Sequence, residues 1–539
     1  MNGLRDLLER YSGVPLTLEA GDLLRKITLY HRIQGSSGLE EAIKEIAESF
    51  ETMGFKTTLF EVPSSSKRGF METPVSWNAR DGFVELRIGG SQLAKFNYHD
   101  HPTLIAAHSP PGEGCGELKY CKEVSGCDGE VVLVEAPGCI AYREIPARLI
   151  ILYDSKRHSE AVPYTGLFIK EGEIKNTSVV NVPYTTALKA ISLLGRNEKL
   201  EVCWKVDTEY MSKPMYGLLA YSGEDPGVLY ISHICHPKPG AHDNASGVVA
   251  NVLTAKLLRR SPEKISHAHL FVPEYSGTVY VHEYLPWMPV AAVNLDMVGS
   301  KQWVTNSTLN IVNAPLFARS VSPAYAYIAT KLVLDKASSF GGFKLPASRY
   351  SLAPYTAGSD HDVTTLWGID SVMLNEWPSK YYHTDMDDAD TISPSQLVNK
   401  AVISALVGSA IAGNHGKGSI ESAFKDFVKS WYAIESLKAG IDVSRVSGVL
   451  ENQVELSVNF EYTPLSSRYL YGKLGVAAFL KLRNVKGAYS FISVYAPLAY
   501  LNGVNNFFEL FQLENLLQWS SEERRLLEEA WLKVEEDIG

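Results

Sequence analysis

The sequence predicts an α/β fold: a mostly parallel, helix-covered sheet with an inserted β-rich domain and an α+β C-terminal region. Three observations predict it. Apolar, β-branched runs alternate with helical stripes in two separated stretches of the 539-residue chain, 28–62 and 215–413. Between them, over 72–207, short β-like runs dominate and helical periodicity is scarce. After residue 415 the alternation ends, and one strand-like segment stands among helical patterns.

The composition is that of a soluble globular enzyme, with 45% hydrophobic and 21% charged residues. The net charge of −10 argues against a general basic face, so we expect no nucleic-acid partner. Arg5, Glu9 and Arg10 interrupt any signal-peptide core, and no apolar run reaches the roughly 18 residues of a membrane span. The longest candidate, 401–413, is interpreted as a buried helix. We therefore expect a cytoplasmic protein with no membrane partner.

Six cysteines are too few for a disulfide scaffold in a chain of this length. Cys115, Cys121 and Cys127 are evenly spaced, which leaves a zinc knuckle as a minor alternative, although no C-x-x-C occurs. A disulfide is expected only in an oxidising or thermophilic setting.

The first stretch begins with a predicted capping box, Ser37 with Glu40, which starts a helix ending at Gly54. A strand at 56–62 follows. The middle region is expected to contain short strands within three runs, 82–88, 129–135 and 147–153.

In the second stretch, strands are predicted at 228–232, 269–272, 289–296 and 369–374, with helices at 246–258 and 395–412. In the C-terminal region an apolar stripe predicts a helix around 424–434, and Ser520 with Glu523 caps a final helix. The segment 453–462 alternates perfectly between apolar and polar residues, which predicts a half-buried strand.

Candidate metal ligands follow the predicted strands of the second stretch. His233 and His236 lie at the end of strand 228–232, and Asp243 opens the next helix. Glu274 and Asp296 each come at the end of a strand, and His383 follows the last one by ten residues. Ligands of α/β proteins bind at the carboxyl ends of strands, and imidazole and carboxylate groups suit zinc.

These motifs resemble the zinc aminopeptidase family, which also includes glutamate carboxypeptidases and glutaminyl cyclases. The pentad DNASG at 243–247, preceded by His233, carries the resemblance most specifically. Four further motifs occur in the same order: PEYSG, NLDMVG, GSDHD and YYHTD, at 273–277, 294–299, 358–362 and 381–385. The resemblance covers 28–62 and 215–413. The run GEVVLV at 129–134 resembles a protease-associated domain, which some family members carry as an insertion.

The resemblance implies that Asp243 bridges two zinc ions. His233 and Asp296 would complete one shell, His383 would belong to the other, and Glu274 would be the general base. The domains implied are a catalytic domain in two parts (1–71 and 208–415), a β-rich protease-associated-like insert (72–207), and a C-terminal region of unknown role (416–539).

Two departures from the family leave the metal count open at one or two zinc ions per chain. Cys235 replaces an expected Asp, and Tyr275 replaces a second, ligating Glu. Three alternatives follow: Glu274 ligates instead of acting as base, Glu283 fills the gap, or the site holds one zinc firmly and the second weakly or not at all. His236 forms an H-x-x-H pair with His233 and is a further candidate ligand.

We expect a zinc-dependent aminopeptidase acting on peptides. The alternatives are a carboxypeptidase, a glutaminyl-cyclase-like transferase, an amide deacetylase, or a non-catalytic binding protein that retains the fold. Tyr275, Tyr381 and Tyr382 are candidate oxyanion donors, and Asp360 and His361 are expected to support the site. Assembly into a homo-oligomer stays open.

Overall fold

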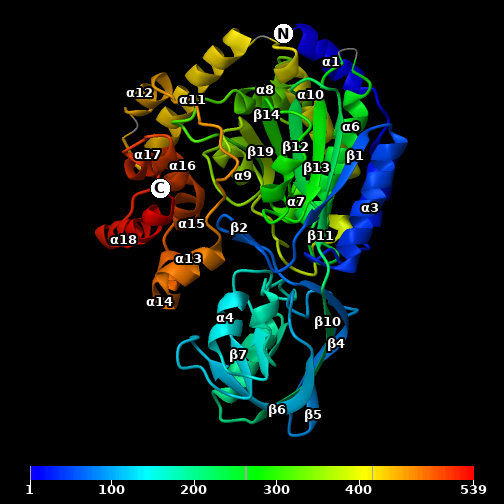
Figure 1. Cartoon of the computed structure of the whole chain (residues 1–539), viewed down its shortest axis with the longest axis vertical. Helices are drawn as coiled ribbons and strands as arrows, with labels where there is room; N and C mark the ends of the chain where they lie inside the picture. Colours follow the sequence, from blue (N-terminus) through cyan, green and yellow to red (C-terminus); the bar gives the residue numbers. More distant parts are fainter. Residues whose placement is uncertain (1, 262–263, 416, 443, 539) are drawn as a thin grey trace.

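The computed structural model describes residues 2–261, 264–415, 417–442 and 444–538. The start of the predicted C-terminal region, residue 416, lies outside the described residues. Figure 1 shows three parts: a large helix-covered sheet, a β-rich body at the opposite end of the long axis, and a group of helices that contains the C-terminus.

The main sheet has eight strands in the order β1-β11-β13-β12-β14-β19-β15-β18. Its four central strands, β13, β12, β14 and β19, run parallel, whereas β1 and β11 are antiparallel additions on one side. This topology confirms the predicted α/β fold. The bounds are β1 Lys56–Val62, β11 Met215–Ser222, β12 Val228–His233, β13 His267–Val272, β14 Ala291–Asp296, β15 Thr308–Val312, β18 Tyr350–Ala353 and β19 Ser371–Trp377.

The central strands are buried on both faces because helices cover the sheet. These helices are α1 Asn2–Ser12, α2 Thr17–Ile27, α3 Ser37–Thr52, α6 Ser246–Leu258, α7 Gln302–Thr305, α8 Ser322–Leu334, α9 His361–Leu366 and α10 Pro394–Ala412. By length and composition α10 is apolar enough to cross a membrane, but 67% of that window is buried. It packs against α6 and α8 and carries the fully buried Lys400, which pairs with Glu376 at 3.1 Å. It is therefore a core helix, as predicted.

The predicted cap of α3 is wrong by one residue. The N-cap is Ser36, whose Oγ accepts the backbone N–H of Leu39 at 3.1 Å and donates to the carbonyl of His31. Glu40 pairs with Lys44 and Lys213 instead of reaching back to the cap. The capping box predicted at the last helix, α18 (Ser521–Ile538), is confirmed: the N–H of Ser520 donates to Glu523 Oε2 at 2.8 Å, and the N–H of Glu523 donates to Ser520 Oγ at 3.2 Å.

The middle region forms its own seven-stranded sheet, ordered β5-β4-β10-β6-β7-β8-β9. Its bounds are β4 Ser76–Ile88, β5 Ser91–Asn97, β6 Gly112–Cys121, β7 Val131–Val134, β8 Leu149–Leu152, β9 Ser178–Asn181 and β10 Leu200–Met211, with helices α4 Gly138–Glu144 and α5 Tyr184–Leu194. We call this body the insert. Its resemblance to a protease-associated domain stays a prediction.

Two disulfides stabilise the insert. Cys115 and Cys203 join the paired strands β6 and β10, and Cys121–Cys127 closes a short loop. Since the three evenly spaced cysteines are all oxidised, the zinc-knuckle alternative is wrong. Such bonds are typical of oxidising compartments and of intracellular proteins from hyperthermophiles. The cytoplasmic location stays an untested prediction.

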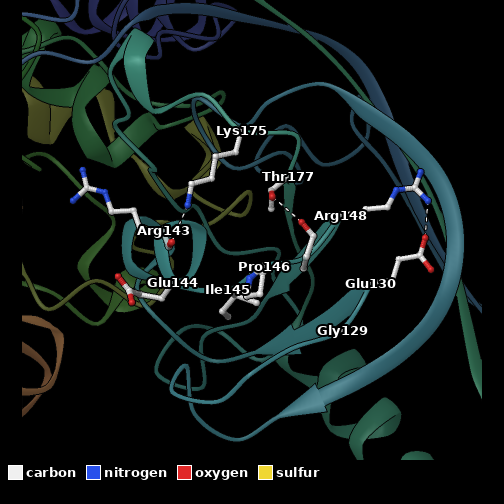
Figure 2. Close-up of a pocket in the computed structure, with 10 residues that line it drawn as sticks. Gly129, Glu130, Arg143, Glu144, Ile145, Pro146, Arg148, Lys175 and Thr177 are labelled. Atoms are coloured by element: carbon white, nitrogen blue, oxygen red, sulfur yellow. Dashed lines mark hydrogen bonds and ion pairs between the residues drawn. The ribbon is translucent and has the colours of Figure 1, made fainter.

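The insert also contains a surface pocket of about 630 Å³ lined by three cations, Arg143, Arg148 and Lys175 (Figure 2). Arg148 pairs with Glu130 at 2.6 Å, and Arg143 pairs with Glu173 at 2.8 Å. Lys175 Nζ donates to the carbonyl of Arg143 at 2.8 Å. Both arginines are thus paired with carboxylates, and Lys175 is hydrogen-bonded to the backbone.

The C-terminal region is helical, and the strand predicted at 453–462 is wrong. That segment makes one isolated bridge, Val454 with Ala318, and Val458 is 56% exposed. Apart from that bridge, no described strand pairs with this segment. Its alternation of apolar and polar residues therefore does not produce a β-strand. The described helices are α11 Lys417–Ala439, α12 Val446–Glu451, α13 Ser467–Leu474, α14 Val476–Leu482, α15 Ala488–Ser490, α16 Ala496–Leu501, α17 Phe507–Glu514 and α18.

Glu514, at the end of α17, connects this region to the main domain by hydrogen bonds. The fully buried carboxylate accepts the N–H groups of Leu316 (3.0 Å) and Tyr355 (3.2 Å) and the hydroxyl of Tyr495 (2.9 Å). Burial raises the pKa of Glu514 from 4.5 to about 7, although these hydrogen bonds oppose the shift. Folding therefore favours the protonated carboxyl.

We expect Glu514→Gln to flatten the pH dependence of stability. Because the folded pKa lies above the unfolded one, the contribution of Glu514 is full below about pH 4.5 and is lost as pH rises through about 7. The free energy of unfolding of the wild type therefore falls by about 3 kcal/mol across this pH range because of Glu514. Thermal unfolding of wild type and variant from pH 5 to pH 8 measures it, with the exposed Glu536→Gln as control. An equal slope in the wild type and Glu514→Gln would contradict this role.

Candidate metal centre

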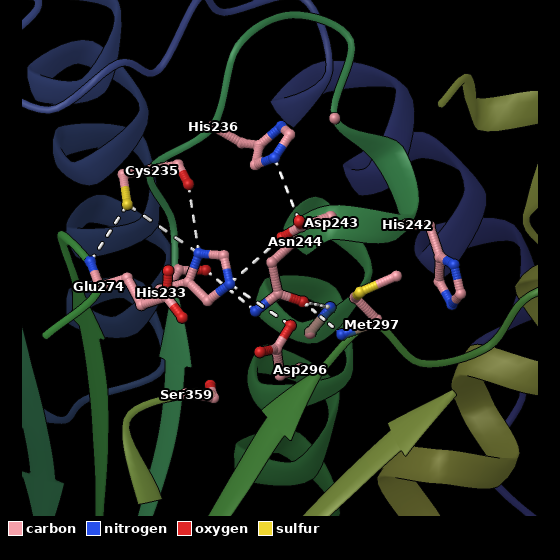
Figure 3. Close-up of polar contacts among 12 residues, drawn as sticks. His233, Cys235, His236, His242, Asp243, Asn244, Glu274, Asp296, Met297 and Ser359 are labelled. Carbon is pink, nitrogen blue, oxygen red and sulfur yellow. Dashed lines mark hydrogen bonds and ion pairs between the residues drawn. The ribbon is translucent and has the colours of Figure 1, made fainter. Parts of the chain in front are cut away.

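The carboxyl ends of the parallel strands bring every predicted site residue into one cavity of about 790 Å³. His233 ends β12, Asp296 ends β14, and Glu274 comes two residues after β13. The cavity lining includes all six candidates: His233, His236, Asp243, Glu274, Asp296 and His383. Figure 3 shows five of them grouped around the turn that leads into α6.

Asp243 offers one carboxylate oxygen to each of two clusters. Its Oδ1 lies 3.3 Å from Nε2 of His233, which is also 3.4 Å from Oδ1 of Asp296. Its Oδ2 lies 3.1 Å from Nε2 of His236 and 3.2 Å from Nε2 of His383. Within each cluster, the three ligand atoms lie within 4.8 Å of one another. This is the arrangement expected when a carboxylate is shared by two cations.

The donor set fits zinc. Among the described residues, the buried Nε2 of His236 and Oδ1 of Asp296 make no well-directed hydrogen bond, although they lie close to Asp243 and His233 and buried polar atoms are normally paired. Nδ1 of His233 lies 3.2 Å from the carbonyl oxygen of Cys235. That hydrogen bond places the proton on Nδ1 and leaves Nε2 as the ligand atom. Each cluster therefore presents imidazole nitrogen and carboxylate oxygen, which zinc prefers.

The turn that carries Asp243 is held by side chains on both sides. Asp387 accepts the N–H groups of His242 and Asp243, each at 2.9 Å. Asn244 Nδ2 donates to the carbonyls of His233 (3.1 Å) and Leu295 (3.0 Å) (Figure 3). The ends of β12 and β14 and the start of α6 are thus fixed as one unit. Asp387 lies just beyond the YYHTD motif at 381–385, so no motif singles it out.

Glu274 is a partly buried residue that belongs to neither cluster. Burial raises its pKa well above the ordinary value, although the charge of His233 opposes the shift. Its backbone N–H donates to Cys235 Sγ at 3.1 Å, so the thiol that replaces the family's Asp helps to position the Glu274 loop. A carboxyl of raised pKa in a cavity is suited to accepting and returning a proton near neutrality.

The ligand missing at Tyr275 is not replaced by Glu283. Tyr275 donates its hydroxyl to Asp362 at 2.6 Å, and its N–H to Asp360 at 2.7 Å. Glu283, at the end of the 3-10 helix η3 (Thr278–Glu283), pairs with Arg68 at 2.6 Å and does not line the cavity. The Glu283 alternative is therefore wrong. The second three-residue cluster contains His236 beside Asp243 and His383.

The remaining predicted residues have distinct positions. Asp360 accepts Thr278 Oγ1 at 2.6 Å, and His361 Nε2 lies 3.0 Å from the carbonyl oxygen of Thr356, so both support loops, as expected. Tyr381 does not line the cavity. Tyr382 does, and its ring stacks on His383 with centroids 3.8 Å apart.

Tyr164, from the insert, lines the cavity beside His236 and His383 and was missed from the sequence. Burial first, and then the charges of Cys235, Asp243 and Glu274, raise its pKa well above the ordinary value. Its local sequence contains no motif. Only the pairing of two segments about 220 residues apart brings it to the metal centre.

Residues 218–407 match the model of peptidase family M28. Among solved structures, a peptidase M28 precursor from Shewanella amazonensis SB2B is 15% identical with a TM-score of 0.54, covering 76% of this chain and 96% of its own. BSAP, a zinc aminopeptidase from Bacillus subtilis, is 17% identical with a TM-score of 0.50, covering 73% and 95%. At these identities the likeness is one of fold. No curated protein matches the chain in sequence.

Proposed function

The chain contains a domain of peptidase family M28, and from this premise we propose that it is a zinc-dependent aminopeptidase that removes N-terminal residues from peptides. The observation that carries the proposal is the placement of the two Asp243 oxygens, one in each of two three-residue clusters. Zinc held there supplies a Lewis acid for the carbonyl and lowers the pKa of water. His233 and Asp296 would hold one ion, and His236 and His383 the other.

Glu274 is the proton carrier of this proposal. It lies on the same cavity as both clusters but outside them, so it is free to take a proton from the attacking water. The same carboxyl then returns the proton to the leaving amine. Its position after a buried strand, with its N–H bonded to Cys235, keeps the side chain close to the clusters.

Two ions are favoured over one because each cluster has two residues of its own besides the shared Asp243. The H-x-x-H pair does not hold a single ion, since His233 and His236 approach different oxygens of Asp243. This also disfavours a non-catalytic binding protein, because the loss of the second Glu is compensated by His236.

We expect His236→Ala to lower the zinc content from about two ions per chain to about one. With one neutral ligand removed from the second cluster, kcat/KM should fall about 10–100-fold. Elemental analysis and hydrolysis of leucyl arylamides measure the two effects. The exposed His99→Ala in the insert is the matched control. If the variant retains two zinc ions per chain, His236 is not a ligand.

The cavity favours a neutral, apolar substrate residue. Among the described residues that line it, none is Lys or Arg, so a C-terminal carboxylate would find no cationic side chain. Val312, Pro354, Met373 and Trp377 supply apolar wall. This disfavours the carboxypeptidase alternative, which requires recognition of that carboxylate.

A substrate panel tests the proposed specificity. We expect the zinc-loaded chain to hydrolyse free-amine leucyl and phenylalanyl arylamides, but not their N-acetylated forms or N-blocked peptides. Release of ammonia from a glutaminyl peptide would instead support the glutaminyl-cyclase-like alternative, and release of acetate would support a deacetylase. We propose a peptide as the partner, with no nucleic acid or membrane, in the cytoplasm; light scattering tests for a homo-oligomer.

A further inference from the structure

We propose that Tyr164, contributed by the insert, donates its phenol O–H to the oxygen of the scissile carbonyl. The inference rests on the proposed hydrolysis and adds a catalytic residue from outside the M28 match, which covers residues 218–407. It gives the insert a direct part in the reaction.

The backbone around Tyr164 is locked to the loop that carries His383. The N–H of Tyr164 donates to the carbonyl of His383 at 2.7 Å, and Pro163 bridges Thr384. Asp385 donates its N–H to the carbonyl of Val162 at 3.1 Å and accepts the N–H of Val162 on Oδ1 at 2.9 Å. The position of Tyr164 relative to His383 is thus set by main-chain pairing.

The ring of Tyr164 lies against both imidazoles of the second cluster. Its centroid is 5.0 Å from that of His236 and 5.1 Å from that of His383, at interplanar angles of 62° and 69°. Both imidazoles direct Nε2 at Oδ2 of Asp243. The Tyr164 ring therefore lies beside the second cluster, and Tyr164 is part of the cavity lining.

Its hydroxyl is the feature that points to a substrate. Two neighbouring phenols are engaged, since Tyr275 and Tyr355 donate to Asp362, each at 2.6 Å. Tyr382 also lines the cavity, but its ring stacks on His383. The hydroxyl of Tyr164 has no hydrogen-bond partner among the described residues. A phenol donor left unpaired on a cavity wall is available to a ligand oxygen.

The chemistry needs a donor at that place. When water attacks the carbonyl carbon, a C–O bond forms, Glu274 takes a proton, and the C=O π pair moves to oxygen. Tyr164 stabilises that oxygen by a hydrogen bond and keeps its own proton. Re-forming the C=O bond breaks the C–N bond, and Glu274 delivers the proton to the amine.

Tyr164→Phe keeps the ring and removes only the donor. In the zinc-loaded full chain we expect kcat to fall about 100-fold while KM stays within about 3-fold. Zinc content and Tm should be unchanged. Affinity for the phosphonic acid analogue of leucine, whose oxygens mimic the tetrahedral state, should fall by about the same factor, whereas affinity for leucine itself should not. Tyr184→Phe, in the insert and stacked on Tyr153, is the matched control.

Two results would overturn the inference. If Tyr164→Phe keeps kcat and phosphonate affinity within about 3-fold of wild type, the phenol is not a donor. If the variant loses zinc, Tyr164 is a ligand or a scaffold for one. A wild-type chain that hydrolyses none of the panel overturns the proposed function instead, and the phosphonate measurement still decides the role of Tyr164.

Discussion

Asp243→Asn is expected to abolish hydrolysis and to remove both zinc ions. The two carboxylate oxygens approach different clusters, and an amide offers one neutral oxygen in place of two charged ones. We expect zinc content to fall from about two ions per chain to near zero, and kcat/KM to fall by at least about 10⁴-fold.

The fold should survive this substitution, because Asp387 binds the backbone N–H of Asp243 and not its side chain. Circular dichroism at matched protein concentration checks this, and the exposed Asp225→Asn serves as the control. A variant that keeps two zinc ions would show that Asp243 does not join the clusters.

Glu274→Gln is expected to lower kcat about 10³-fold while zinc content stays the same. Glutamine preserves the shape of the side chain and the N–H bond from the backbone to Cys235, but it cannot accept the proton of the attacking water. The measurements are steady-state kinetics on a leucyl arylamide and elemental analysis of the same sample. Asp225→Asn again controls for a neutralised surface carboxylate.

The two other outcomes are informative. Full activity in Glu274→Gln would exclude Glu274 from the mechanism. Loss of zinc would show that Glu274 ligates, as the absence of a second Glu at Tyr275 first suggested. The structure favours neither outcome, because Glu274 lies outside both clusters and each cluster already contains three candidate ligands.

The candidate metal centre was predictable from the sequence because short motifs, each within a few residues, mark its candidate ligands. Each ligand follows a strand or opens a helix, and parallel strands bring their carboxyl ends to one edge. The DNASG motif identifies Asp243, and the ends of predicted strands identify His233 and Asp296. The sequence left open which residue stands in for the ligand missing at Tyr275. His236 lies beside Asp243 Oδ2, whereas Glu283 lies at the surface with Arg68.

Other features were not predictable because they depend on contacts distant in the chain. Tyr164 reaches the metal centre only through pairing of its segment with residues 383–385. The alternation at 453–462 has the same period as a strand, but a strand also needs a neighbour to pair with, and only Val454 finds one. The disulfide Cys115–Cys203 joins residues 88 apart, a separation that spacing alone does not single out.

The cavity is bounded by all three parts of the molecule. Phe168 comes from the insert, and Tyr489 and Asn515 come from the C-terminal region, whose docking depends on Glu514. The C-terminal region therefore forms part of the cavity wall as well as packing against the main domain.

The most direct test of the shared carboxylate is anomalous diffraction at the zinc edge from zinc-loaded crystals. The structure predicts two peaks, one bounded by His233, Asp243 and Asp296 and the other by His236, Asp243 and His383. A single peak, or two peaks of which one does not contact Asp243, would contradict it.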